Sequence, residues 1–207
     1  MLALYDHPIS SNALKVRFLL AELGLPYERR TVPIERPRPQ WYVDVNPIGG
    51  IPTLDDDGFV LTESNSILRY LANREGRDDL YPAEPAQRGM VDAFLDRFSL
   101  TFRPALFRVE LDALGFTPQG GFRTREPDPD TARATEAEIA PTMRTLDAIV
   151  GDTGFALGRF TIADCAAAPA LFRTTRTGMD LSPYPNLVRW RDTLIARPSF
   201  AAAEPVE

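Results

Sequence analysis

The chain has 207 residues, of which 44% are hydrophobic and 25% are charged, and it carries a formal net charge of −6. This composition is typical of a globular protein with one large or two small domains. Lysine and arginine gather in no segment, so we expect no nucleic-acid partner. The longest apolar run, residues 165–172, is far below the roughly 20 residues that cross a bilayer, so we expect a cytoplasmic protein with no membrane partner.

Two residue types are nearly absent, and this limits the chemistry. Cys165 is the only cysteine, which excludes an internal disulfide, and His7 is the only histidine. One histidine is too few for a histidine-based metal site, and it makes a Ser-His-Asp triad hard to build. We therefore expect no metal, and we expect chemistry that uses hydroxyls, carboxylates or a bound cofactor.

The first 76 residues alternate between strand and helix patterns. In chain order they predict a strand (2–6), a helix from Ala13 to Gly24, a strand within 27–34, a short helix or irregular segment (35–45), a hairpin (51–62) that turns at Asp57-Gly58, and a helix (63–76). This order is typical of a small α/β layer with mixed strands.

The second half of the chain is predicted to be all-helical. It follows a polar, proline-marked linker within residues 76–87. We expect a long helix (87–114) kinked at Pro104, a loop rich in Gly, Pro and Asp (115–130), a helix to about residue 150, a buried helix capped by Thr161 and Asp164, and a final helix (186–197) ending at Pro198.

Two adjacent hydroxyls, Ser10 and Ser11, stand between the first strand and the first helix. The simpler interpretation is a helix cap, because serine is favoured just before a first helical turn. The same place also favours an anion, because free N–H groups and the positive end of the helix dipole point outward there. Ser10 has no evident base, so its hydroxyl suits hydrogen-bond donation better than nucleophilic attack.

Two further segments each allow a structural and a functional interpretation. In NPIGGIPTL (46–54), Pro52 either marks the first residue of a strand or follows a cis bond that turns the N–H and C=O of Ile51 toward a ligand. In TESNSIL (62–68), Glu63 and Ser64 either cap a helix or bind the ammonium and carboxylate groups of a ligand.

In this order, these segments resemble the glutathione S-transferase family. SSNALKVRFLLAELGLPYE resembles the family's first helix, NPIGGIPTL its NPxGxxP segment, ESNSILRYL its ES-x-x-I-x-x-YL helix, and FTIADCAAAP the capping motif of a buried helix in its C-terminal domain. The resemblance covers nearly the whole chain and points to cytosolic, serine-type, bacterial-like members of the family.

The resemblance implies two domains. Residues 1–76 would form a thioredoxin-like domain with a mixed four-stranded sheet that binds glutathione. Residues 87–207 would form a helical-bundle domain that contributes a pocket for a small hydrophobic electrophile. The implied activity is transfer of alkyl or aryl groups to glutathione, a detoxification reaction, and the implied assembly is a homodimer.

The resemblance also assigns roles to individual residues. Ser10, with Ser11 as the neighbouring alternative, would hydrogen bond to the glutathione thiol and favour its thiolate, which is the nucleophile. The backbone of Ile51 would pair with the cysteinyl part of glutathione, next to a cis bond. The bond before Pro52 would be this cis bond. Glu63 and Ser64 would bind the γ-glutamyl end of glutathione.

One feature departs from the family. Many relatives carry Lys, Gln, His or Arg just before the hydrophobic-Pro pair, where it reaches glutathione, whereas this chain has Gly49 and Gly50. The contact is either missing, which predicts weak glutathione affinity, or supplied by Arg36, Arg38 or Trp41 in the preceding segment. The departure mildly favours an alternative function, a non-catalytic binding or interaction module with the same fold.

The electrophile pocket has four candidate residues, Ile9, Phe98, Phe102 and Phe107, although phenylalanines at these spacings are more typical of a core. Cys165, within an alanine-rich helix, is expected in the core as well. The intact serine and the two ligand segments favour the enzyme over the non-catalytic module, because a module without a ligand needs none of them.

Overall fold

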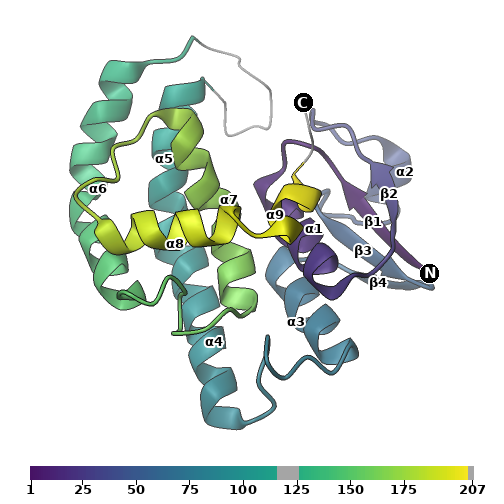
Figure 1. Ribbon diagram of the computed structural model, residues 1–207. Coiled ribbons are helices and arrows are strands. Elements are labelled where there is room, and N and C mark those ends of the chain that lie inside the picture. The colour runs from purple at the N-terminus through teal and green to yellow at the C-terminus, as the bar shows by residue number, and fades with distance from the viewer. Residues whose placement is uncertain (116–125, 205–207) are drawn as a thin grey trace.

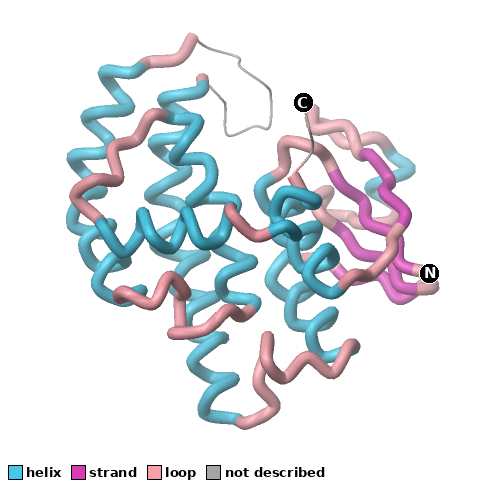
Figure 2. Tube along the Cα trace, in the orientation of Figure 1, coloured by secondary structure: helices cyan, strands magenta, loops and turns pink. Residues whose placement is uncertain are grey.

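The computed structural model describes residues 1–115 and 126–204 (Figure 1). A small sheet lies at one side of the molecule and a group of long helices at the other, with α1, α3 and α9 between them. All the described strands lie in the first half of the chain, and the rest is helix and loop (Figure 2). Within the described ranges, no helix is both long and apolar enough to cross a bilayer.

The sheet has four strands in the order β2-β1-β3-β4. β1 is parallel to β2 and antiparallel to β3, and β3 is antiparallel to β4. The elements of this half are β1 (Leu2–Asp6), α1 (Ser11–Leu23), β2 (Glu28–Thr31), α2 (Gln40–Val43), β3 (Thr53–Asp56), β4 (Phe59–Leu61) and α3 (Ser64–Arg74). Their order and the mixed strand directions confirm the predicted thioredoxin-like layer.

Local signals place the ends of these elements. Gly24 ends α1 in the left-handed conformation, at φ +64°, where glycine has no Cβ to clash. Asp57 and Gly58 both have positive φ and join β3 to β4, as expected for a two-residue hairpin turn. The Asp55 carboxylate accepts a hydrogen bond from the Gly58 N–H at 2.8 Å, which fixes the turn.

The second half is helical, as predicted. Its elements are α4 (Pro85–Arg97), the π-helical turn η1 (Phe98–Phe102), α5 (Arg103–Leu114), α6 (Pro129–Val150), α7 (Ile162–Thr177), α8 (Pro185–Ile195) and α9 (Pro198–Ala203). The expected helix 87–114 is interrupted by η1, and Pro104 stands in the first turn of α5, where its missing N–H needs no partner. Most of the loop expected at 115–130 lies outside the described residues.

One helix boundary differs from the prediction. Pro198 does follow the end of α8, but it also begins another helix, α9. A proline is tolerated in the first helical turn, so it can start a helix as readily as it can stop one. α9 packs on α1, where Phe200 meets the ring of Phe18 edge-on at 5.2 Å.

A continuous hydrophobic core joins the two halves. It runs from the inner face of the sheet, through α1 and α3, to α4 and α7. Trp190, which is fully buried, packs edge-on against Phe94 and Phe98 at 5.9 and 6.4 Å. The side chains at the end of α1 and the start of α3 are therefore held by both halves of the chain.

Candidate functional site

The three predicted ligand segments meet at one end of the sheet. β1 ends beside the start of β3, because the two strands are antiparallel with Tyr5 opposite Thr53. β4 ends at the same edge, because it is antiparallel to β3. Ser10 follows β1, the pair Ile51–Pro52 precedes β3, and the start of α3 follows β4.

Ser10 is the N-cap of α1. Its Oγ accepts a hydrogen bond from the Ala13 N–H at 3.2 Å, and its own N–H donates to the His7 carbonyl at 2.9 Å. The cap predicted from the sequence is thus confirmed. Accepting this bond leaves the hydroxyl proton of Ser10 available for donation to a ligand. The cap and a ligand contact are therefore compatible at this residue.

Ser11 is placed differently from its neighbour. It is buried, at 7% exposed, and its Oγ accepts a hydrogen bond from Nη2 of Arg103 at 2.9 Å. Arg103 belongs to α5, so this bond joins the start of α1 to the second half of the chain. The alternative site residue Ser11 is already engaged within the protein, whereas Ser10 is partly exposed.

His7 is not arranged as a base for Ser10. Its Nδ1 accepts a hydrogen bond from the Ile9 N–H at 3.3 Å. Burial lowers the pKa of His7 below its usual value of 6.5, and the nearby Asp6 carboxylate opposes this shift. The imidazole of His7 therefore closes a tight turn, which is a structural role.

The bond between Ile51 and Pro52 is cis, as the resemblance implied. Ile51 itself lies outside the strands, directly before β3. Among the described residues, neither its N–H nor its C=O takes part in a hydrogen bond. Both groups can thus pair with an extended ligand.

A polar network fixes the residue before Ile51. The Gly50 carbonyl accepts from Nδ2 of Asn46 at 2.9 Å and from the Tyr42 hydroxyl. Both of these side chains also contact the Thr53 hydroxyl, at 3.0 and 2.9 Å. Asn46 and Thr53 are almost completely buried, so the backbone on both sides of the cis bond is held from within the protein.

Gly49 is held against the side chain of Arg38. Its φ is +67°, and a Cβ added to it would lie 2.9 Å from Arg38 Cγ. Nε of Arg38 donates to the Gly49 carbonyl at 3.0 Å, and its Nη1 donates to the Pro33 and Glu35 carbonyls at 2.6 and 3.1 Å. Arg38 therefore positions the loop that precedes the cis bond.

Arg36 and Trp41 are the other two candidates for the glutathione contact that relatives make from the position of Gly50, and both differ from Arg38. Arg36 is exposed, and its Nη1 would lie 3.9 Å from a Cβ on Gly49. Trp41 packs its ring against Tyr5 and Tyr42, with ring centroids 6.4 and 5.7 Å away. Of the two guanidinium groups beside the paired glycines, that of Arg36 is thus the more exposed to solvent, while that of Arg38 is held by backbone carbonyls.

Glu63 precedes α3 in an unusual conformation. Its φ is +65°, a value that costs a non-glycine residue energy, and strained conformations of this kind cluster at functional sites. It stands at the N-cap position, but its side chain makes no capping hydrogen bond, so a cap is not its role. No ion pair joins the Glu63 carboxylate to any described residue, so it can accept an ammonium group.

Ser64, the first residue of α3, contacts the buried Lys15. Nζ of Lys15 lies 3.5 Å from both Ser64 Oγ and Asn65 Oδ1. Lys15 is only 3% exposed, and burial lowers its pKa to about 7, with a smaller lowering by the positive charge of Arg103. The negative charge of Glu63 acts in the opposite direction. The start of α3 therefore combines free N–H groups with a cationic side chain.

The residues proposed for an apolar pocket separate into two groups. Phe98 and Phe102 are buried, at 0% and 2% exposed, so they belong to the core, which is the interpretation that their spacing favoured. Phe107 is partly exposed, with Cζ of Arg103 lying 5.0 Å from its ring centroid. The carbonyl of Ile9 accepts a hydrogen bond from Arg173 of α7.

Four residues of this region, three charged and one a neutral amide, were not predicted from the sequence: Lys15, Arg103, Arg173 and Asn65. Lys15 is the only lysine of the sequence and lies within an apolar helix, which is a signal that could have marked it as special. Asn65 donates to Ser99 Oγ at 2.9 Å, which again joins α3 to the second half. No local pattern predicts the two arginines, because their partners are far away in sequence.

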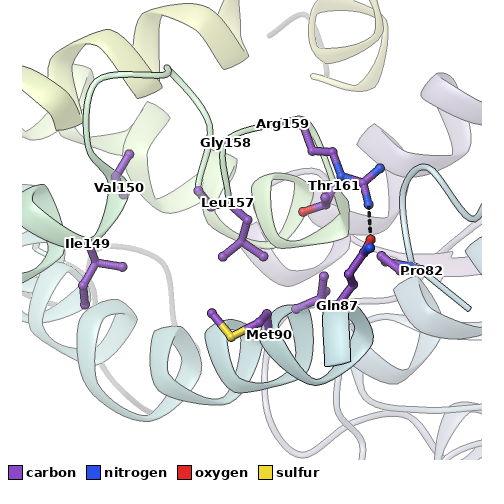
Figure 3. A pocket seen from close by; sticks show the side chains of 11 residues that line it. Pro82, Gln87, Met90, Ile149, Val150, Leu157, Gly158, Arg159 and Thr161 are labelled. Atoms are coloured by element: carbon purple, nitrogen blue, oxygen red, sulfur yellow. Dashed lines mark hydrogen bonds between the residues drawn. The ribbon is translucent and has the colours of Figure 1, made fainter. Parts of the chain in front are cut away.

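A separate cavity of about 460 Å³ lies between α4, the end of α6 and the loop before α7 (Figure 3). Met90, Ile149 and Leu157 give it apolar walls, and Arg159 and Gln87 are joined by a hydrogen bond of 3.4 Å at one end. None of the predicted site residues lines it, so this cavity is not part of the candidate site.

The capping box before α7 is confirmed. Thr161 caps the helix, and Asp164 accepts a hydrogen bond from the Thr161 N–H at 2.8 Å. Cys165 is completely buried beside it, and burial raises the pKa of its thiol well above the usual value, as expected for an inert core residue.

In the described ranges, no group of three or more His, Cys, Asp or Glu side chains is arranged to hold a metal ion.

Comparisons with known proteins agree with this fold. Residues 9–74 match the family model described as Glutathione S-transferase, N-terminal domain, and residues 129–193 match the corresponding C-terminal domain. The chain is 31% identical over 206 residues to Glutathione S-transferase GstB of Escherichia coli, an alignment that covers 96% of this chain and 95% of that protein. It is 30% identical to a probable maleylacetoacetate isomerase of Caenorhabditis elegans, with 98% and 92% covered.

A solved structure extends the comparison to a bound ligand. A glutathione transferase family member from Pseudomonas fluorescens, with two glutathione bound, superposes with a TM-score of 0.79 at 26% identity. The superposition covers 98% of this chain and 92% of that protein.

Proposed function

This chain belongs to the glutathione S-transferase family, and we propose that it is a glutathione transferase in which Ser10 holds the glutathione sulfur as a thiolate. The observation that carries the proposal is the position of Ser10 at the N-terminus of α1, with its hydroxyl partly exposed and its proton free to donate. The thiolate then attacks a small electrophile.

The energetics of this step are reasonable. A thiol with a pKa of about 8.5 is only a few per cent ionised at neutral pH. Lowering its pKa by about two units requires about 2.7 kcal/mol of preferential stabilisation of the thiolate. A hydroxyl donor and the N-terminus of a 13-residue helix can together supply a stabilisation of this size.

We assign the remaining parts of glutathione to the other two segments. The free N–H and C=O of Ile51, next to the cis bond at Pro52, pair with the cysteinyl backbone. Ser64 and the first N–H groups of α3 bind the γ-glutamyl carboxylate. The Glu63 carboxylate, which pairs with no cation among the described residues, binds its ammonium group. The glycyl carboxylate falls to Arg36, which lies beside Gly49.

The proposal includes domains and assembly. Residues 1–76 form the glutathione-binding domain and residues 87–207 contribute the electrophile site. We place the protein in the cytoplasm, where glutathione is kept reduced. We also propose a homodimer, which the exposed apolar side chains of Met90 (62%) and Leu100 (80%) on α4 and η1 support. Sedimentation of a monomer at micromolar concentration would count against the dimer.

The test is a calorimetric titration of glutathione into wild type, Ser10→Ala and Ser11→Ala, with thiolate absorbance followed against pH in each complex. We expect all three proteins to bind glutathione. The thiol pKa should be lowered in wild type and Ser11→Ala but not in Ser10→Ala, whose turnover at pH 7 should fall about twenty-fold with the thiolate fraction.

Two other outcomes lead elsewhere. An unchanged thiol pKa and turnover in Ser10→Ala would reduce Ser10 to a helix cap. Binding of glutathione without a lowered pKa in any of the proteins would favour the alternative function, a non-catalytic module that keeps the ligand. The paired glycines at positions 49 and 50 are the feature that favours this alternative.

A further inference from the structure

Three cationic side chains from three helices meet beside residues 9–11. Lys15 comes from α1, Arg103 from α5 and Arg173 from α7. Arg103 donates from Nη2 to Ser11 Oγ at 2.9 Å, and Arg173 donates to the Ile9 carbonyl. The proposed thiolate-holding residue, Ser10, therefore stands between two residues that guanidinium groups contact, Ile9 through its carbonyl and Ser11 through its hydroxyl.

The carboxylates of this region do not balance its cations. Arg173 pairs with Glu110, a residue that is only 5% exposed. In the part of the chain that the structure describes, no carboxylate forms an ion pair with Arg103 or with Lys15, and Arg103 has only the neutral Ser11 hydroxyl as a hydrogen-bond acceptor. A guanidinium has five N–H donors, and leaving a desolvated cation without a counter-ion is costly. The region is thus prepared for an anion.

The two unpaired cations face different parts of the site. Lys15 contacts Ser64 and Asn65 at the start of α3, where the γ-glutamyl carboxylate of glutathione is assigned. Arg103 contacts the start of α1 from the second half of the chain, and the Phe107 ring lies against its guanidinium. Arg103 and Phe107 therefore approach the start of α1 from the second half of the chain, which is the half proposed to contribute the electrophile site.

We propose that the second substrate is an aromatic or unsaturated electrophile that carries a carboxylate, with Arg103 binding the carboxylate and Phe107 contacting the apolar part. This inference rests on the proposed function, because it assumes that a glutathione thiolate forms beside Ser10. Arg103 is a specificity-determining residue in this scheme. It selects the electrophile and takes no part in bond making.

The reaction balances with a chloronitrobenzoate as the probe electrophile. The thiolate sulfur attacks the ring carbon that carries chlorine, and its electron pair forms the S–C bond. The C–Cl bond breaks, and chloride leaves with the electron pair of that bond. The thiol proton has already gone to solvent, so no oxidant or reductant is required, and the carboxylate remains unchanged.

The test compares 4-chloro-3-nitrobenzoate with its methyl ester, which shares the ring and the leaving group but has no charge. The variants are Arg103→Gln, Arg103→Lys as the charge-preserving rescue, and Arg108→Gln as a control on the exposed side of the same helix. We expect Arg103→Gln to lower the acid-to-ester ratio of kcat/KM at least ten-fold. Arg103→Lys should recover part of this loss, and Arg108→Gln should leave the ratio within two-fold of wild type.

Equilibrium binding separates this inference from the proposed function. Calorimetry with the unreactive 3-nitrobenzoate and its methyl ester reports the preference for the acid without turnover. A wild-type preference for the acid that is lost in Arg103→Gln supports the inference, even if no conjugation occurs and the proposed function fails. Equal binding of acid and ester by wild type overturns it. A loss of glutathione affinity in Arg103→Gln as large as the loss for the acid also overturns it, because Arg103 would then serve glutathione.

Discussion

Arg17 donates from Nη1 to both carboxylate oxygens of Asp6, at 2.7 and 2.8 Å, and the two side chains are 2% and 0% exposed. Nε of Arg17 also donates to the Ala203 carbonyl at 2.8 Å, and Nη2 donates to the Pro8 carbonyl at 3.2 Å. One guanidinium therefore joins the end of β1, the loop that carries Ser10, and α9. The placement of the site depends on this ion pair.

Replacing Arg17 by Met should destabilise the protein strongly. Asp6 would remain buried with only Arg29 as an ionic partner, so we expect a loss of about 3–5 kcal/mol in the free energy of unfolding. Urea denaturation measures it. The matched control is Arg77→Met, which breaks an exposed pair with Asp79 and should cost at most about 1 kcal/mol. Equal losses in the two variants would contradict the argument.

Replacing Asp164 by Ala should reduce stability and spare activity. Its carboxylate accepts from the Ala156 N–H at 2.8 Å, the Thr161 N–H at 2.8 Å and the Trp190 indole N–H at 2.7 Å, all of them buried. Without this carboxylate, three buried N–H donors lose their acceptor, which should cost at least about 3 kcal/mol of unfolding free energy. The activity per folded molecule should stay within two-fold of wild type, and the control Asp180→Ala, at an exposed turn, should cost less than about 1 kcal/mol. A large drop in activity at full stability would instead connect Asp164 to the reaction.

Replacing Gly49 by Ala should weaken glutathione binding as well as stability. The new Cβ would be strained at φ +67° and would press on Arg38 Cγ, which must shift and release the Gly49 carbonyl. We expect this strain to lower the free energy of unfolding by about 2–3 kcal/mol. We also expect a higher Kd for glutathione, because the loop that leads to Ile51 would move. Gly24→Ala is the control, since its φ of +64° is similar and nothing lies within 4 Å of the added atom. It should cost about 1–2 kcal/mol and leave the Kd unchanged.

Replacing Lys15 by Met should stabilise the protein in a pH-dependent way. The pKa of Lys15 falls from 10.5 to about 7, so between these values the unfolded chain holds a proton that the folded chain does not. Lys15 therefore destabilises the folded protein less and less as the pH rises across this window. Its full destabilising effect, which is the cost of burying a charged ammonium group, applies below pH 7. The gain from Lys15→Met should be larger at pH 7 than at pH 9 by about 1–3 kcal/mol.

The titration of Lys15 can also be observed directly. It is the only lysine of the sequence, so lysine-selective labelling gives a single side-chain resonance, whose midpoint should lie near pH 7. A midpoint near 10.5 would show that the ammonium group is solvated in solution. The pH dependence expected for Lys15→Met would then be absent as well.

Short-range signals explain why much of the fold could be predicted from the sequence. The cap at Ser10, the turn at Asp57-Gly58 and the capping box of Thr161 and Asp164 each depend on residues within four positions of one another. The same holds for the order of strands and helices, because hydrophobic periodicity is local.

The charged part of the site could not be predicted in this way. Arg103 meets Ser11 across 92 positions, and Arg173 meets Ile9 across 164. The ring of Phe98 packs against Trp190, a partner that is equally remote in sequence. Periodicity indicates that a residue faces a neighbour, but only the packing of several helices decides which neighbour it is.

The contact of α9 with α1 has a consequence for how the chain is made. α1 ends at residue 23 and α9 begins at residue 198. At roughly 5–20 residues per second, the ribosome therefore completes α1 about 9 to 35 seconds before it begins the helix that covers it. During that interval the ring of Phe18 lacks Phe200, and Nε of Arg17 lacks the Ala203 carbonyl. The nascent N-terminal half therefore exposes an apolar helix face that a chaperone can bind, and it acquires its finished surface only when translation of α9 is complete.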